Sequence, residues 1–300
     1  MSAAPLLAAL PSDLVLTLVD VGSAGGLNPR WNPYRSILSS VLFDPREEAA
    51  AGEFGRGQTR VYPVALGEQS GKAPLHLTAM ANMSSFLEPD PEVMARYGKK
   101  RGDSAVVATE QVQIERLDSL AEQDGFRPDV LKVDTQGSEL MVLNGAEQAL
   151  YSVLLAEIEV SFFRRYRDQP LFADIEAHMA KRGFELIELQ KLKRYRASNR
   201  LNIRNAGVGK GDHSGRVTYG DAIFLRREES ILSASKSDGG ASLMRAVVAL
   251  AAYGKADIAA RLLDQGHESL AEQRGKAIGR GLIGLGQRQF GFLARLLGKG

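Results

Sequence analysis

The chain has 300 residues, 44% of them hydrophobic, so it can bury a sizeable core and is not a disordered protein. Its 38 Lys and Arg residues against 36 Asp and Glu give a formal net charge of +2, which excludes the strongly basic composition of proteins that coat nucleic acids. Because the chain has no cysteine, disulfide scaffolds, Cys-ligated zinc, iron–sulfur clusters and thiol nucleophiles are also excluded.

The N-terminal segment lacks the features of a secretory signal. Its first basic residue is Arg30, and its apolar start is interrupted by Pro11 and Asp13. No run of uncharged apolar residues is long enough for a transmembrane helix. We therefore expect a cytoplasmic protein.

Short apolar runs alternate with helical segments along the first three quarters of the chain. Residues 14–21 (LVLTLVDV) are typical of a strand that is buried on both faces of a sheet. Similar runs follow at 40–43, 59–66, 129–133, 153–160, 184–189 and 221–225, and helical segments at 45–52, 136–150 and 171–182. This alternation predicts an α/β fold with a doubly wound, Rossmann-like sheet, decorated by further strands at 73–79 and 104–114.

The composition changes after residue 226. Residues 229–240 predict a linker, and 241–265 predict a pair of antiparallel helices that turns at Gly254. Segment 271–300 carries six basic residues against one acid, and eight glycines that weaken a continuous helix. We interpret it as a solvated, partly frayed tail, with a basic amphipathic surface for membrane or partner contact as the alternative. The predicted domains are thus a core at 1–228, the linker, and a helical, basic extension at 241–300.

The first strand runs into a glycine-rich turn, Asp20-Val21-Gly22-Ser23-Ala24-Gly25-Gly26. Such a turn lets the backbone approach a ligand in the crevice beyond the carboxyl ends of the strands. The carboxylate of Asp20 disfavours a dinucleotide pyrophosphate and suits a ligand with a cationic amino acid end.

The second strand ends at Asp44, where a carboxylate can accept two hydrogen bonds from a ribose diol. NAD and S-adenosylmethionine both carry such a diol, and the turn at Asp20 favours S-adenosylmethionine. The alternative role of Asp44 is to cap a helix that starts at Pro45.

Residues 131–147, LKVDTQGSELMVLNGAE, resemble the hallmark segment of the FkbM family of S-adenosylmethionine-dependent methyltransferases. Further similar segments stand in order: VDVGSAGG at 19–26, LFDP at 42–45, ALGEQSG at 65–71, SSFLEPD at 84–90, IERLDSL at 114–120, AEIEVSFFRRYRDQPLF at 156–172 and GDAIF at 220–224. The resemblance covers about residues 14–226 and does not extend to the tail. It implies a class I methyltransferase sheet and O-methylation of a hydroxyl on a sugar, glycan, glycolipid or secondary metabolite.

With S-adenosylmethionine as the cofactor, one group of residues is expected to contact it: Asp20, Gly22, Ser23, Ala24, Gly25, Asp44, Ala65, Leu66 and Asp134. A base for the acceptor hydroxyl must lie on loops at the carboxyl ends of the central strands. Asp134 ends the strand at 129–133, and Glu139 lies in the first turn of the next helix, where capping is its alternative role. His213 lies in a glycine-rich loop that could close over a substrate. Asp134, Glu139 and His213 are therefore the candidate catalytic residues.

The acceptor is expected to contact Ser84, Ser85, Gln136, Glu157 and Glu159. We expect the two glutamates to point to opposite faces of their strand, so that at least one faces the site. Clustered carboxylates could instead hold a divalent cation. The family commonly has an acid where this chain has Gln136, however, so a metal is not favoured.

Three alternatives to this function stay open. An RNA methyltransferase would need a continuous basic surface beside the pocket, which the clusters at 99–101 and 164–167 suggest. A catalytically idle adapter would bind partners through the helical tail, and a nicotinamide oxidoreductase is least favoured. For the leading hypothesis the partner is a small-molecule or glycan acceptor and no nucleic acid. Peripheral membrane contact by the basic tail and a homo-oligomer are left open.

Overall fold

The computed structural model describes residues 2–23, 26–46, 55–97, 100–203 and 214–297, with side chains up to residue 285. The strands are β1 (Leu16–Val21), β2 (Leu38–Phe43), β3 (Gln58–Tyr62), β4 (Ala65–Leu66), β5 (Gly71–Thr78), β6 (Val106–Glu115), β7 (Val130–Val133), β8 (Leu155–Ser161), β9 (Phe184–Tyr195) and β10 (Arg216–Arg226). The α-helices are α1 (Ala4–Ala8), α2 (Pro91–Ala95), α3 (Lys100–Asp103), α4 (Leu117–Asp124), α5 (Glu139–Asn144), α6 (Phe172–Lys181), α7 (Glu228–Ser237), α8 (Ala241–Ala252), α9 (Ala256–Gln265) and α10 (Glu272–Leu297). Short 3₁₀ segments are η1 (Pro29–Ile37), η2 (Ala81–Met83), η3 (Ala149–Tyr151) and η4 (His267–Ser269).

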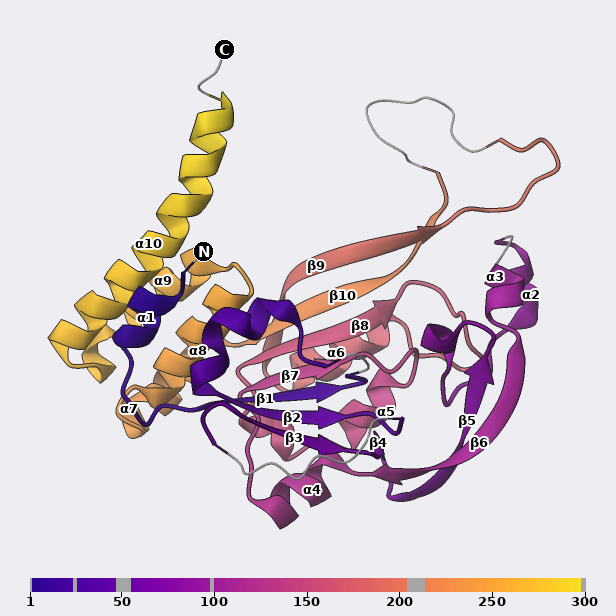
Figure 1. The fold of residues 1–300 in the computed structure, drawn as a ribbon, viewed down its shortest axis with the longest axis horizontal. Helices are drawn as coiled ribbons and strands as arrows, with labels where there is room; N and C mark the ends of the chain where they lie inside the picture. Colours follow the sequence, from indigo (N-terminus) through magenta and orange to yellow (C-terminus); the bar gives the residue numbers. More distant parts are fainter. Residues whose placement is uncertain (1, 24–25, 47–54, 98–99, 204–213, 298–300) are drawn as a thin grey trace.

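Seven strands form one sheet in the order β3-β2-β1-β7-β8-β10-β9 (Figure 1). Strands β3, β2, β1, β7 and β8 are parallel, and β10 is antiparallel to both of its neighbours. The strand order reverses between β1 and β7, and α/β sheets bind ligands outside the carboxyl ends of strands at such a point. The predicted Rossmann-like methyltransferase sheet is therefore confirmed.

Apolar side chains pack on both faces of this sheet. Leu16 and Leu18 of β1 pack with η1 and the C-terminal helices, whereas Val19 and Val21 pack with α5 and α6 on the other face. All residues of β2 and β8 are buried. The continuous apolar runs in the sequence thus reflect strands that are covered on both sides.

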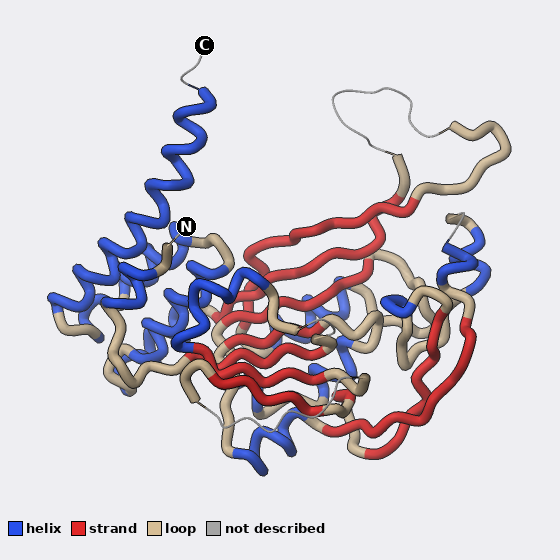
Figure 2. Tube along the Cα trace, viewed as in Figure 1, coloured by secondary structure: helices blue, strands red, loops and turns tan. Residues whose placement is uncertain are grey.

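Strands β5 and β6 form a separate antiparallel ribbon, with β4 added at one end in the order β4-β6-β5. The ribbon confirms the two decorating strands predicted at 73–79 and 104–114. Figure 2 shows that it curves past the end of the large sheet where β1 and β2 finish. It therefore supplies a wall to any pocket at that end.

The C-terminal helices pack on the sheet. The segment predicted as a linker contains helix α7, whose Ile231 is fully buried. Helices α8 and α9 form the predicted hairpin around Gly254, which has a φ of +74°. The domain boundaries stay a prediction, but α7 and α8 share one apolar core with β1, β7, β8 and β10.

The last helix differs from the frayed tail expected from its glycines. Residues 272–297 form a helix, and α10 packs against α1. At Gly281 a Cβ atom would lie 2.7 Å from the Cα atom of Leu6, so only glycine allows this close approach. Among the described residues, no helix combines the length and the apolar character that crossing a bilayer requires.

Candidate functional site

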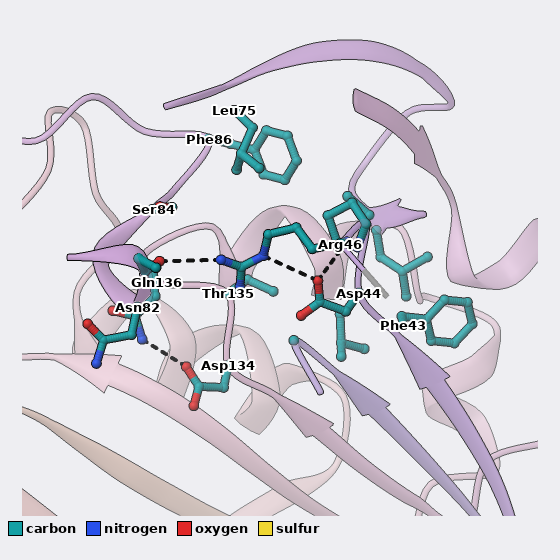
Figure 3. A pocket seen from close by; sticks show the side chains of 16 residues that line it. Phe43, Asp44, Arg46, Leu75, Asn82, Ser84, Phe86, Asp134, Thr135 and Gln136 are labelled. Carbon is teal, nitrogen blue, oxygen red and sulfur yellow. Dashed lines mark hydrogen bonds and ion pairs between the residues drawn. The ribbon is translucent and has the colours of Figure 1, made fainter. Parts of the chain in front are cut away.

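A pocket lies where β1, β2 and β7 end, between the large sheet and the β5–β6 ribbon (Figure 3). Its lining consists of Val21, Gly22, Phe43, Asp44, Pro45, Arg46, Ala65, Leu66, Leu75, Ala81, Asn82, Ser84, Phe86, Asp134, Thr135 and Gln136. This is the switch point of the sheet, where the fold is expected to bind its ligand.

Gly22 forms the floor of the pocket. Its φ is +78°, and a Cβ atom here would overlap the backbone carbonyl of Asp134. Its N–H donates to the carbonyl of Phe43 at 2.8 Å, and the N–H of Asp134 donates to the carbonyl of Val21 at 3.0 Å. The ends of β1, β2 and β7 are thereby held together, and only glycine allows the Asp134 backbone to approach this closely.

Asp44 is almost fully buried at the end of β2, with 3% of its surface exposed. Its Oδ1 accepts a hydrogen bond from the backbone N–H of Arg46 at 2.9 Å, and the Arg46 Nε lies 3.5 Å from the same oxygen. The Arg46 side chain continues across the pocket, where Nη1 lies 3.5 Å from the carbonyl of Ala81 (Figure 3). The helix predicted at 45–52 lies largely outside the described residues.

Apolar side chains line the pocket beside Asp44. Phe43 stacks on Tyr62, with the ring centroids 4.9 Å apart, and Leu75 and Phe86 form a second apolar wall (Figure 3). An apolar slot next to a carboxylate suits a flat heterocycle attached to a sugar.

Several of these lining residues are not among the site residues predicted from the sequence. Phe43 and Arg46 flank Asp44 in the segment LFDPR, which was a usable signal. Leu75 and Phe86 reach the pocket only through the path of the ribbon, which has no local sequence signal.

The turn after β7 places Gln136 between two carboxylates. The Gln136 backbone has a φ of +56°, a region that non-glycine residues adopt at a cost and often at functional sites. Its Nε2 donates to Asp134 Oδ1 at 2.9 Å and to both carboxylate oxygens of Glu159 at 3.2 Å. Asp134 and Gln136 line the pocket, whereas Glu159 contacts it through Gln136.

The Glu139 side chain holds this turn in place through hydrogen bonds to its backbone. Its carboxylate accepts hydrogen bonds from the backbone N–H groups of Thr135 at 3.0 Å and Gly137 at 2.9 Å. Burial raises the pKa of Glu139, while these hydrogen bonds act in the opposite direction. Glu139 is not among the pocket-lining residues, so its contacts support the capping role, and a catalytic role stays a prediction.

Glu159 is a buried carboxyl group with a strongly perturbed pKa. Burial, with the nearby Asp134 and Glu139, raises its pKa to about 8. Arg165 opposes this shift: its Nη2 lies 3.2 Å from Glu159 Oε2, and the arginine is itself only 2% exposed. The Arg165 guanidinium stacks over the ring of Tyr219 at 4.4 Å. Perturbed carboxyl groups of this kind are typical of functional sites.

Glu157 lies two residues earlier on β8 and behaves differently. Burial alone would raise its pKa, but Arg30 at 3.0 Å, the Tyr253 hydroxyl at 2.7 Å and Lys191 at 3.1 Å together lower it. The expectation that Glu157 and Glu159 point to opposite faces is wrong, because residues two apart on a strand share a face. Neither lines the pocket.

Asp20 lies on β1 with its carboxylate 2.8 Å from Lys132 Nζ on β7, to which it is paired in register. It is buried and is not among the sixteen pocket-lining residues. Burial raises the pKa of Asp20, and Lys132 acts against this rise. Its predicted contact with the amino acid end of the cofactor stays a prediction.

The other predicted residues divide into three groups. Gly22, Asp44, Ala65, Leu66, Ser84, Asp134 and Gln136 line the pocket. Ser23 and Ser85 are buried outside the lining, where Ser85 Oγ accepts from the N–H of Leu87 at 3.0 Å. Ala24, Gly25 and His213 lie outside the described residues. Within the ranges that the structure describes, no group of three His, Cys, Asp or Glu side chains is arranged to hold a metal ion.

Comparison with known proteins identifies this domain. Residues 38–186 match the family described as the methyltransferase FkbM domain. The chain therefore contains an FkbM methyltransferase domain. The resemblance found in the sequence is confirmed, and the pocket, with Asp44, Asp134 and Gln136, is lined largely by residues of the FkbM domain. The family implies S-adenosylmethionine as the methyl donor.

Solved structures show only distant similarity. Magnesium protoporphyrin IX methyltransferase from Synechocystis, solved with bound S-adenosylmethionine, is 11% identical, with a TM-score of 0.32 over 75% of this chain and 76% of that one. A protein of the NADB-Rossmann superfamily from Streptococcus agalactiae is 13% identical, with a TM-score of 0.27 over 92% and 96%. No curated protein matches the sequence.

Proposed function

We propose that the protein transfers a methyl group from S-adenosylmethionine to a hydroxyl of a sugar, glycan, glycolipid or secondary metabolite. One observation carries the proposal. A single pocket at the switch point combines the buried carboxylate of Asp44 and apolar walls with the polar turn that holds Asp134 and Gln136.

The residues present fit the methyl donor. Asp44 can accept hydrogen bonds from the two ribose hydroxyls, and the apolar walls around Phe43 and Phe86 can hold the adenine ring. Gly22 lines the pocket without a side chain, so the donor can approach the backbone at the end of β1. Arg46, which crosses the pocket beside Asp44, would have to move aside or pack against the donor.

When bound, S-adenosylmethionine supplies a methyl group that its sulfonium has already activated. The chain must then orient the acceptor hydroxyl and remove its proton. Two carboxylates line the pocket, and with Asp44 assigned to the ribose, Asp134 is left for the acceptor; the Gln136 amide donates to it at 2.9 Å. We assign Asp134 as the proton acceptor, with Gln136 contacting the acceptor molecule and Glu159 behind them.

The contacts do not favour the RNA alternative. Of the basic cluster at 164–167, Arg165 is buried against Glu159, and Arg167 lies 3.5 Å from Glu88. Two of the three arginines in this cluster are thus paired with acids, which reduces the cationic surface that they could offer to RNA.

Isothermal titration with S-adenosylmethionine tests the donor. Wild-type protein is expected to bind, and Asp44→Ala to bind at least about tenfold more weakly, because hydrogen bonds to a charged group contribute roughly 1.5–3 kcal/mol. Asp13→Ala is the matched control, since Asp13 is an exposed aspartate outside the pocket. Failure of folded wild-type protein to bind millimolar donor would refute the proposal.

A transfer assay tests the acceptor. The protein is incubated with donor and a panel of hydroxylated glycans and glycolipids, or with donor and structured RNA. The masses of the products are measured by mass spectrometry. Methylation of a saccharide hydroxyl is the expected result. Methylation of RNA alone would instead establish the alternative function.

A further inference from the structure

The segment η1 follows the glycine-rich turn, and its first residues are held by Glu157 inside the matched FkbM domain and by Tyr253 outside it. Asn28 caps η1, its Oδ1 accepting from the N–H of Arg30 at 3.0 Å. Arg30 then reaches Glu157 on β8, with Nη1 3.0 Å from Oε2 and Nη2 3.5 Å from Oε1. The far end of the turn is thus fixed by one buried carboxylate.

The C-terminal helices complete this anchor. Tyr253, which follows α8, donates its hydroxyl to Glu157 Oε2 at 2.7 Å. The Arg30 guanidinium lies over the Tyr253 ring at 4.2 Å from the centroid. The same ring packs edge-to-face against Trp31 at 6.0 Å, and Trp31 is 2% exposed. Tyr253 therefore contacts Arg30 and Trp31, the second and third residues of η1.

Asp20, at the start of the turn, is held on the same face of the sheet as Glu157. Lys132 Nζ lies 2.8 Å from Asp20 Oδ1, and Asp20 precedes Gly22 by two residues. Glu157 lies beside these groups, since it is paired with Lys132 across the β7–β8 ladder. Each end of the turn is thus anchored by a buried ion pair, and only the far one includes a side chain from the C-terminal extension.

We propose that Tyr253 is a positioning residue for methyl-donor binding, through which the C-terminal helices set the position of the glycine-rich turn. The inference rests on the proposed function, because the turn is assigned to the donor. Tyr253 acts through Glu157 and Arg30 and does not itself line the pocket. The extension is on this view part of the donor site and not a detachable appendage.

The test compares two Tyr→Phe variants on either side of Trp31. Tyr253→Phe removes the hydroxyl that Glu157 accepts and keeps the ring. Tyr34→Phe is the matched control. Tyr34 is 4% exposed and packs edge-to-face against Trp31 at 6.3 Å. Among the described hydrogen bonds, none joins Tyr34 to Glu157, whereas Tyr253 makes one. Calorimetric titration gives the dissociation constant for S-adenosylmethionine, and turnover at saturating donor gives kcat.

We expect Tyr253→Phe to bind S-adenosylmethionine about tenfold more weakly, because Glu157 and Arg30 lose a positioning contact and residues that touch no ligand can change its affinity by this order. Tyr34→Phe should stay within about twofold of wild type, and kcat should stay within about twofold for both, because neither group touches the reacting atoms. Arg30→Lys should repeat the loss, since an ammonium cannot replace the two-pronged contact to Glu157.

The only tryptophan of the chain gives an independent readout. Trp31 follows the turn, so donor binding should shift its fluorescence in wild-type protein, with a smaller shift in Tyr253→Phe. Wild-type binding with unchanged affinity in both Tyr253→Phe and Arg30→Lys would overturn the inference. Absence of binding by wild-type protein would instead overturn the proposed function, so the two failures are distinguishable.

Discussion

Glu157 and Glu159 lie two residues apart on the same face of β8, yet their surroundings shift their pKa values in opposite directions. Glu157 contacts Arg30, Lys191 and the Tyr253 hydroxyl, which outweigh its burial and lower its pKa. Burial dominates at Glu159, where Arg165 is the opposing charge, and the pKa rises to about 8. One strand thus presents a carboxylate that is held ionised and a carboxyl group that readily takes a proton.

The difference follows from which parts of the chain meet each side chain. Glu157 is contacted by η1, β9 and the end of α8, and none of these lies wholly within the matched domain at 38–186. Glu159 is contacted by Gln136 and Arg165, both inside that domain. The Glu157 end is therefore held by segments outside or at the edge of the matched domain, whereas the Glu159 end contacts the turn that lines the pocket.

The largest effect is expected on kcat, for a substitution of Asp134 beside Gln136 and Glu159. Asp134→Asn keeps the shape of the side chain but removes the carboxylate proposed to accept the proton, so kcat should fall by about 10²–10⁴. Glu157→Gln serves as the comparison, and its kcat per folded molecule should change by less than about tenfold, because Glu157 is a structural anchor that does not line the pocket. Rates are measured at saturating donor. Equal losses of kcat in the two variants would contradict the different roles given to Asp134 and Glu157.

The second effect is on stability and concerns the anchor. Glu157→Gln leaves Arg30 and Lys191 without their shared carboxylate, and breaking a buried ion pair costs about 3–5 kcal/mol. Urea unfolding measures the loss. Glu147→Gln is the control, because Glu147 is half-exposed and pairs with Arg182 at the surface, where the loss should stay below about 1 kcal/mol. A Glu157→Gln protein as stable as the control would show that the anchor contributes little.

The contributions of the two glutamates to the unfolding free energy should change with pH in opposite directions. For Glu159, whose folded pKa is raised to about 8, the stabilising contribution is present below the ordinary value of 4.5 and is lost as pH rises through about 8. For Glu157, whose pKa is lowered, the contribution is present above 4.5 and is lost as pH falls through the folded value. Subtracting the unfolding free energy of each Glu→Gln variant from that of wild type should give curves of opposite slope. Parallel curves would contradict the opposite shifts.

Much of the fold could be predicted from sequence because its signals are local. The strand runs and the turn at Gly254 are confirmed, except that the run at 59–66 divides into β3 and β4 of two different sheets. Asp44 and Asp134 line one pocket because each directly follows a parallel strand. The carboxyl ends of parallel strands share one edge, so this convergence needs no long-range information.

The rest depends on contacts between distant segments. The pairing of Asp20 with Lys132 depends on the register of the β1–β7 ladder, which the sequence does not specify. Lys191 reaches Glu157 from an irregular point in β9, where its φ is +52°. Tyr253 lies ninety-six residues beyond Glu157, in a segment that composition alone separates from the core. No local pattern predicts these contacts.

The smallest effect is expected from Gln136→Glu, which places a third acid between Asp134 and Glu159. The variant replaces a donor that both carboxylates accept with a like charge, so we expect a loss of about 1 kcal/mol in unfolding free energy at neutral pH. The loss should shrink near pH 5, where a carboxyl group at this position is more often protonated. Added Mn²⁺ should also reduce it, because three clustered carboxylates can bind a hard cation and binding stabilises the folded state. Equal stability of variant and wild type at neutral pH without metal would show that the Gln136 amide does not offset the charges around it.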